Sequence, residues 1–69
     1  MMRRVAAHEL LIDGQMLRQA VVEIAEGRVV NYYTFDRELP MTEWLGGTIE
    51  VMRSEEGVLE AFHQGRRLL

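Results

Sequence analysis

The sequence contains no cysteine, no lysine and only one proline, and these scarcities exclude several classes of structure. Without cysteine, the 69-residue chain can form neither disulfides nor thiolate metal sites. Without lysine, it cannot form a phosphate-binding loop of the Walker type. No apolar run approaches the roughly 20 residues of a membrane-spanning helix, so we expect no membrane association.

The N-terminal stretch lacks the pattern of a secretory signal peptide. Arg3-Arg4 precedes the apolar residues 5–12, but His8 and Glu9 interrupt them and no small-residue cleavage site follows. The lack of cysteine is compatible with a reducing compartment. We therefore expect a cytoplasmic protein.

What the sequence does contain is enough apolar material for one folded domain. The hydrophobic fraction is 48%, well above that of disordered chains. A domain of this size buries only about 60% of the surface that its unfolded chain exposes, so association with a partner is one route to added stability. We expect a single domain over residues 1–69.

The charged residues argue against nucleic acid as a partner. Eight arginines stand against eleven acidic residues, for a formal net charge of -3. A phosphate-binding surface needs basic residues that cluster without interleaved acids. Here Glu9, Asp13, Glu23 and Glu26 lie within or beside the strands that we expect.

Glycine-containing turn signals divide the first half of the chain into three β-rich segments. Asp13-Gly14 and Glu26-Gly27 are such signals, because glycine readily takes the positive φ that tight turns need. Consecutive strands joined by tight turns predict an antiparallel meander. We expect its strands over residues 5–12, 16–25 and 28–35.

The register of the second hairpin stays open at this point. A two-residue loop pairs Ile24 with Val29. A three-residue loop, with Gly27 as the bulge residue, pairs Ile24 with Arg28 and Val22 with Val30. Because one residue of slip exchanges the faces of a whole strand, the inward side chains of the third strand cannot be assigned.

Residues 36–47 form the least regular part of the sequence. Pro40 ends any strand at this point. We expect one short helical turn over residues 42–45, which would let Trp44 and Leu45 plug the open side of the sheet. For a domain so short of large apolar groups, we prefer this plug to a ligand-binding platform.

The last third of the chain predicts two further strands. Residues 48–53 alternate as a strand does, and residues 58–63 fit either a strand or a helix. We favour the strand, since Gly57 weakens a helical first turn by close to 1 kcal/mol relative to alanine. The fold is therefore predicted to be mainly β: a small antiparallel β-roll or sandwich meander with at most one short helical turn.

Residues that could carry chemistry are few. His8 and His63 lack the short spacings of metal-binding histidines, and a metal site shared with Glu9 or Glu60 is the weaker alternative. Ser54 is expected to form a turn rather than to act as a nucleophile. We therefore expect no catalytic residue, no metal and no cofactor.

Three aromatic residues are the candidates for an interface. Tyr32 and Tyr33 are adjacent, so a strand places one ring on each face and at most one of them in the core. Trp44 is the single tryptophan of the chain. Both residue types are enriched in protein interfaces.

The first half of the chain resembles the opening of metal-dependent amidohydrolases. The matching pieces are a polar-Gly turn at Asp13-Gly14, the Val22-Glu23-Ile24 element, and an acidic-Gly turn at Glu26-Gly27 followed by an apolar strand. In that family the segment belongs to a small β-sandwich domain beside the catalytic barrel. The family's metal-binding His-x-His has no counterpart here, and a barrel of about 250 residues could not fit. The resemblance thus implies a fold and argues against the activity.

A second resemblance concerns residues 42–48. This segment is similar to part of small uncharacterised proteins of Bacteroides-type bacteria, which implies a bacterial origin. It implies nothing about activity.

Three functions remain open on sequence grounds. The one we favour is a non-catalytic module that binds another protein or forms a homodimer, because a small open sheet leaves unpaired edges. An alternative is a small-molecule-binding accessory subunit, with Trp44, Tyr32 or Tyr33 lining a pocket. A third is a metal-dependent enzyme that uses His8 and His63.

Overall fold

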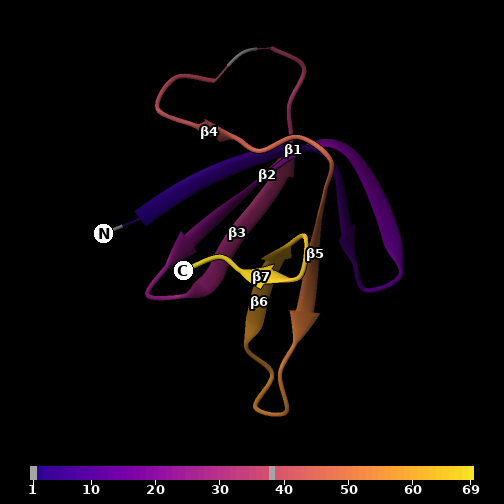
Figure 1. Cartoon of the computed structure of the whole chain (residues 1–69), viewed down its shortest axis with the longest axis vertical. Coiled ribbons are helices and arrows are strands. Elements are labelled where there is room, and N and C mark those ends of the chain that lie inside the picture. Colours follow the sequence, from indigo (N-terminus) through magenta and orange to yellow (C-terminus); the bar gives the residue numbers. More distant parts are fainter. Residues whose placement is uncertain (1, 38) are drawn as a thin grey trace.

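Seven strands and no helix make up the computed structural model, which describes residues 2–37 and 39–69 (Figure 1). The strands are β1 (Met2–Ile12), β2 (Gln15–Ala25), β3 (Arg28–Thr34), β4 (Glu43–Trp44), β5 (Thr48–Arg53), β6 (Leu59–His63) and β7 (Arg66–Arg67). The mainly β fold predicted from the sequence is confirmed. Among the described residues, no helix has the length and apolar character needed to cross a membrane.

The meander β1–β2–β3 forms as predicted, through turns of one type. Asp13 and Gly14 have φ values of 49° and 76°, and Glu26 and Gly27 have 53° and 76°. Positive φ at both central residues is the mark of the type I′ turn, whose twist matches that of the strands it joins. Each turn therefore sets the pairing of the two strands beside it.

The second hairpin combines a two-residue loop with a bulge. Ile24 pairs with Val29, as the two-residue alternative predicts, but the register then shifts and Val22 pairs with Tyr32. Val30 is thus the extra residue of the bulge. Because the bulge reverses the alternation along β3, Val29 and Tyr32 point to the same side of the sheet.

The sheet is mixed: the predicted antiparallel meander is present, but β1 also has two parallel partners that the sequence did not predict. β5 pairs with β1 in parallel, with Leu10 beside Ile49. A parallel pair requires a crossover of about a dozen residues, and residues 35–47 provide it. Figure 1 shows this crossover looping over the top of the sheet.

The helical turn expected over residues 42–45 is absent. Glu43 and Trp44 instead form β4, which pairs in parallel with β1 beside Val5 and Ala6. The amide of Leu45 donates a 2.9 Å hydrogen bond to the carbonyl of Ala6. Strand pairing thus satisfies backbone groups that an isolated helical turn would leave open.

The ambiguous segment before the C-terminus is a strand, as favoured from the sequence. β6 pairs antiparallel with β5 over Leu59–His63, and Gln64 and Gly65 turn the chain into β7. Ser54 forms the preceding loop, since its Oγ accepts hydrogen bonds from the amides of Glu56 and Val58. Its role as a turn former is confirmed.

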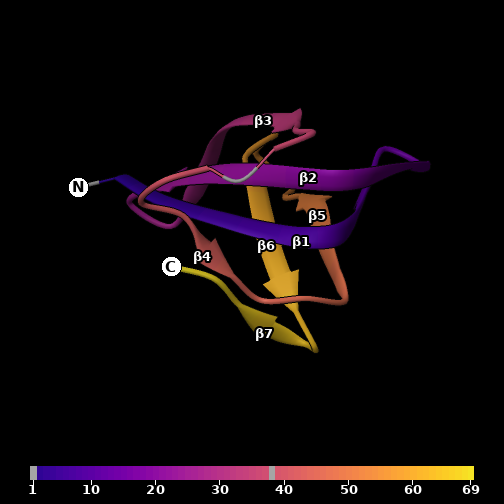
Figure 2. The same ribbon diagram turned by 90° about the horizontal axis from the view of Figure 1, so that it is seen from above.

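The strand order β3-β2-β1-β5-β6-β7 curls into a roll that does not close. Seen from above, β6 runs across the direction of β1 and β2 (Figure 2), and it lies close to β3 across the gap in the roll. The core fills the inside. Its buried side chains are Val5, Ala7, Leu10, Ile12, Ala20, Val22, Ile24, Val29, Ile49, Val51, Ala61 and Leu68.

Candidate functional site

The outer face of the β1–β2 hairpin carries a second, smaller group of buried side chains. Ala6 and Val21 are directly paired across the two strands and are 3% and 0% exposed, yet neither belongs to the inner core. Trp44 continues this row on β4, beside Ala6, and Tyr33 continues it on β3, beside Val21. The row places two of the three predicted interface residues on one face.

Trp44 remains half exposed on this face, so the prediction that it plugs the open side of the sheet is wrong. Its exposed fraction is 52%. Leu45, by contrast, packs against the inner core as predicted. The two neighbours differ because successive residues of a strand point to opposite faces.

Two aromatic rings, those of His8 and Phe35, flank the indole of Trp44. The ring of His8 lies 4.7 Å from that of Trp44, and the ring of Phe35 lies 6.3 Å away, measured between centroids. Both pairs are edge-to-face, with interplanar angles of 88°. This is a favoured geometry for aromatic pairs, so the indole is supported on two sides.

A pocket opens beside Trp44, and we call it the Trp44 pocket. It has a volume of about 270 Å³ and is lined by Ala6, Phe35, Leu39, Thr42 and Trp44. None of these described lining residues is charged. The hydroxyl of Thr42 donates a 3.2 Å hydrogen bond to the carbonyl of Pro40, which leaves the oxygen free to accept one.

A polar network lies next to Val21 on the same outer face. The carboxylate of Glu23 accepts hydrogen bonds from Tyr33 Oη at 2.9 Å, Arg4 Nε at 3.1 Å and Asn31 Nδ2 at 3.4 Å. The Tyr33 hydrogen bond is the main cause of a lowered pKa for Glu23. Burial, helped by Glu23, raises the pKa of Tyr33. Tyr33 is thus held within the network.

Strand β3 is one edge of the sheet, and its outer side is open. The amide of Phe35 donates to the carbonyl of Gln19 at 2.9 Å, so the alternation of the ladder turns the amides of Tyr32 and Thr34 away from β2. Among the described residues, β3 forms a ladder with β2 alone. We call the outward backbone groups of Tyr32 and Thr34 the free edge.

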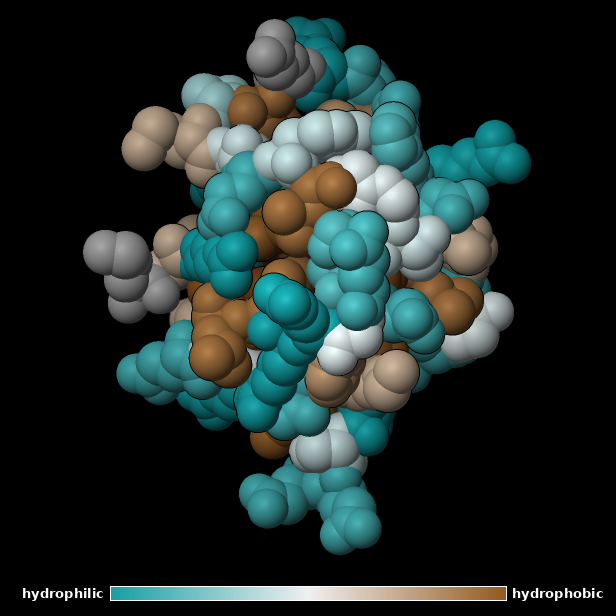
Figure 3. Space-filling view, in the orientation of Figure 1, coloured by the Kyte–Doolittle hydropathy of each residue, from teal (hydrophilic) through white to brown (hydrophobic). Residues whose placement is uncertain are grey.

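The side chains along the free edge are uncharged and partly apolar. Val30 is 53% exposed and Tyr32 is 39% exposed. Tyr32 pairs with Val22 and therefore points to the opposite face from Tyr33 and Trp44, as predicted for adjacent residues. On the face of the molecule shown in Figure 3, hydrophobic patches (brown) lie between hydrophilic ones.

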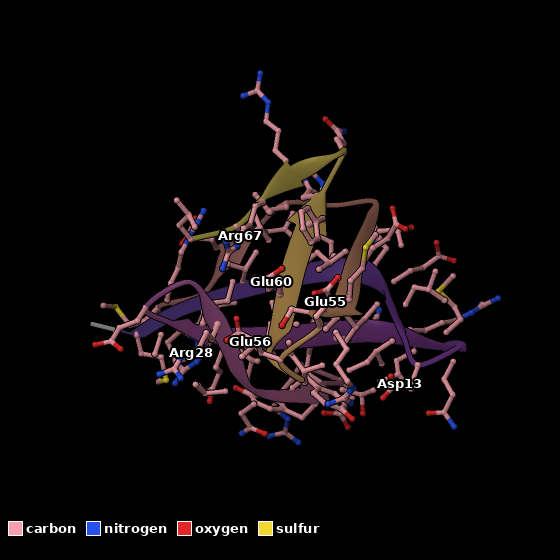
Figure 4. All side chains as sticks on the ribbon, turned by 90° about the horizontal axis from the view of Figure 1, so that it is seen from below. Asp13, Arg28, Glu55, Glu56, Glu60 and Arg67 are labelled. Atoms are coloured by element: carbon pink, nitrogen blue, oxygen red, sulfur yellow. The ribbon has the colours of Figure 1, made fainter. Side chains whose placement is uncertain are left out.

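The opposite edge of the sheet is protected. β7 has only two residues, both exposed arginines. Arg67 donates to the carbonyl of Gly27 at 3.0 Å and pairs with Glu60 at 3.0 Å, and the side chains of Arg67 and Glu60 point toward each other in Figure 4. Short strands and exposed charges are common protections of sheet edges, and β3 lacks both over residues 29–34.

A second groove separates β3 from the β5–β6 hairpin, and its charges are mixed. Arg28 and Arg53 line it. Each has an exposed acidic neighbour, since Arg53 lies 3.3 Å from Asp13 and Arg28 lies 3.5 Å from Glu26. Figure 4 shows further carboxylates on this side of the molecule. No single charge sign dominates, so the groove favours no ligand class.

The two histidines make separate contacts. His8 packs edge-to-face against Trp44, while His63 Nε2 lies 3.1 Å from the carbonyl oxygen of Gly46. Over residues 2–37 and 39–69, no group of three histidine or acidic side chains is placed to hold a metal ion. The sequence did not predict that Phe35 packs against Trp44 or that Asn31 bonds to Glu23. The first contact depends on the crossover, and the second depends on the bulge in β3.

Comparison of the chain with models of known protein families, with characterised proteins and with solved structures finds no match.

Proposed function

We propose that this chain is a non-catalytic interaction module that forms a homodimer by pairing strand β3 of one copy with β3 of a second. The observation that carries the proposal is the free edge. Tyr32 and Thr34 direct their backbone groups away from β2, in a stretch without charge. A strand edge that no neighbouring strand covers is a template for another strand.

The geometry of the free edge suits a symmetric partner. When two copies of β3 run antiparallel about Tyr33, Tyr32 of each copy lies opposite Thr34 of the other. These two pairs supply about four backbone hydrogen bonds. A twofold dimer uses the same surface on both copies, and the uncharged stretch brings no like charges together. The expected interface is small, so the dimer is expected to be weak.

Analytical ultracentrifugation over a concentration series tests the proposal. The wild-type chain is expected to show a reversible monomer–dimer equilibrium. Tyr32→Lys places a charge on the edge strand and should shift the equilibrium to monomer. Met52→Lys is the matched control, because Met52 is 50% exposed on β5, which is paired on both sides. The control should dimerise as the wild type does.

A second variant separates the backbone edge from the side chain. Thr34→Pro removes an amide that has no partner within the described residues, so the monomer should keep its fold by circular dichroism. It should nevertheless fail to dimerise. A wild type that stays monomeric at about millimolar concentration, or a Met52→Lys variant as impaired as Tyr32→Lys, would count against strand addition.

Compartment and origin are part of the same proposal. We infer a cytoplasmic bacterial protein from its composition and from the resemblance of residues 42–48. The likeness of the first three strands to the β-sandwich domain of amidohydrolases stays a prediction. To test the compartment, the epitope-tagged chain is expressed in a bacterial host and located by cell fractionation.

A further inference from the structure

We propose that the Trp44 pocket binds an uncharged aromatic ring that carries one hydrogen-bond donor, such as a phenol. The pocket lies on the outer face of β1 and β4, whereas the homodimer contact uses the edge of β3. The inference is therefore independent of the proposed function.

The walls of the pocket meet as a corner of two rings. The planes of Phe35 and Trp44 are 88° apart, with centroids 6.3 Å from each other. A third ring placed in such a corner lies parallel to one wall and perpendicular to the other. It thus makes an offset-stacked and an edge-to-face contact at once, the two arrangements that aromatic pairs prefer. An aliphatic group of equal size gains neither.

The corner is held in place before any ligand arrives. His8 packs edge-to-face against Trp44 at 4.7 Å, and the backbone of Leu45 is bonded to Ala6. Glu43 precedes Trp44 in β4, and its carboxylate accepts two hydrogen bonds from Arg3, of 2.7 and 2.9 Å. A wall fixed in this way loses little further freedom when a ligand binds.

The chemistry of the lining selects the ligand class. Its described residues offer no charge to pair with an ion, and burying an unpaired charge is unfavourable. Among the described lining residues, the one side-chain oxygen is that of Thr42, which already donates its proton to Pro40 and so can only accept. The volume of about 270 Å³ exceeds the roughly 150 Å³ of a cavity that holds benzene.

Trp44 makes the binding directly observable. As the only tryptophan, it reports on the pocket through its fluorescence, and its indole N–H gives a single resolved NMR signal. We expect p-cresol to shift both signals in a saturable way. Toluene, which lacks the donor, and cyclohexylmethanol, which lacks the ring, should bind more weakly.

Variants of the lining give the decisive comparison. Phe35→Leu keeps an apolar wall but removes the ring, and it should weaken p-cresol binding by about 2- to 10-fold while leaving cyclohexylmethanol unchanged. Thr42→Val should reduce the affinity for p-cresol to that for toluene. Tyr32→Leu, which alters an aromatic residue outside the pocket, is the control and should have no effect.

Two sources could supply the ring, and a further probe distinguishes them. N-acetyl-tyrosine amide presents the same phenol with a peptide backbone attached. If it binds as well as p-cresol, the ring comes from a partner's side chain. If only p-cresol binds, the source is a free small molecule. Absence of any saturable shift, equal affinity for cyclohexylmethanol, or an equal loss in Tyr32→Leu overturns the proposal.

Discussion

Asn31 Oδ1 accepts a 2.9 Å hydrogen bond from the backbone amide of the next residue, Tyr32. That amide points to the free edge of β3, where a neighbouring strand would otherwise supply a carbonyl. The side chain of Asn31 is itself oriented by Glu23, which accepts from its Nδ2 at 3.4 Å. Asn31 therefore competes with any strand that pairs along this edge.

The first prediction removes this competitor. Asn31→Val leaves the amide of Tyr32 without an intramolecular acceptor, so strand addition no longer has to displace a hydrogen bond. The dimer dissociation constant should fall by about 30-fold, since each of the two copies no longer gives up one ordinary hydrogen bond of about 1 kcal/mol. Sedimentation equilibrium measures it. Asn31→Ser keeps an oxygen acceptor near the amide and should change the constant less, and weaker association in the valine variant would contradict this role.

The second prediction concerns the Tyr33–Glu23 hydrogen bond and pH. Tyr33→Phe removes a charge-assisted bond of 2.9 Å and should lower the free energy of unfolding by about 1 kcal/mol at neutral pH. Because the folded-state pKa of Glu23 is lowered, its stabilising contribution is present above the unfolded-state pKa. That contribution is lost as the pH falls through the folded-state pKa.

Urea denaturation at about pH 7 and about pH 3 measures this effect. The difference between wild type and Tyr33→Phe should shrink at the lower pH, which lies below the unfolded-state pKa of a glutamate, because the stabilisation of the Glu23 carboxylate is lost as the pH falls. Tyr32→Phe is the matched control, because no hydrogen bond of its hydroxyl is found among the described residues and its removal should matter little at either pH. A Tyr33→Phe difference that is the same at both pH values would show that the carboxylate is not the partner that matters.

The third prediction tests which face of β1 lies in the core. Leu10 is 1% exposed and packs in the inner core, whereas the adjacent Leu11 is only half-buried on the other face. Leu10→Ala should lower the free energy of unfolding by about 2–5 kcal/mol, since it removes a fully buried side chain and leaves a cavity. Thermal unfolding followed by circular dichroism reports the loss.

Leu11→Ala makes the same chemical change one residue further along and serves as the control. It should lower stability by only about 1 kcal/mol, because part of its side chain is already in contact with water. A larger loss in Leu11→Ala than in Leu10→Ala would mean that β1 is shifted by one residue from the register described above.

Local signals were sufficient to predict most strands and turns. Asp13-Gly14 and Glu26-Gly27 have the turn chemistry that type I′ hairpins need, and the strand over 48–53 matches β5. The parallel pairing of β1 with β5 leaves no such local mark, because it depends on where a 13-residue crossover returns the chain. The bulge at Val30 is equally hidden, since two adjacent valines fit either register.

The candidate sites were predicted only in part. Trp44 and Tyr33 were identified by residue type, and the structure places them on one face. The positions of Phe35 and His8 around Trp44 depend on tertiary packing, so the sequence contains no spacing that announces them. The free edge could be expected of any small open sheet, but only the ladder shows which amides point outward.

The last prediction concerns the turn between β6 and β7. Gln64 has a φ of 53°, a left-handed conformation that asparagine tolerates better than glutamine does. Gln64→Asn should therefore raise the free energy of unfolding by about 0.5 kcal/mol. Gln15→Asn makes the same chemical change within strand β2, where asparagine is disfavoured, and should give no gain. Urea denaturation of both variants decides the matter, since equal effects would mean that backbone strain at Gln64 is not relieved.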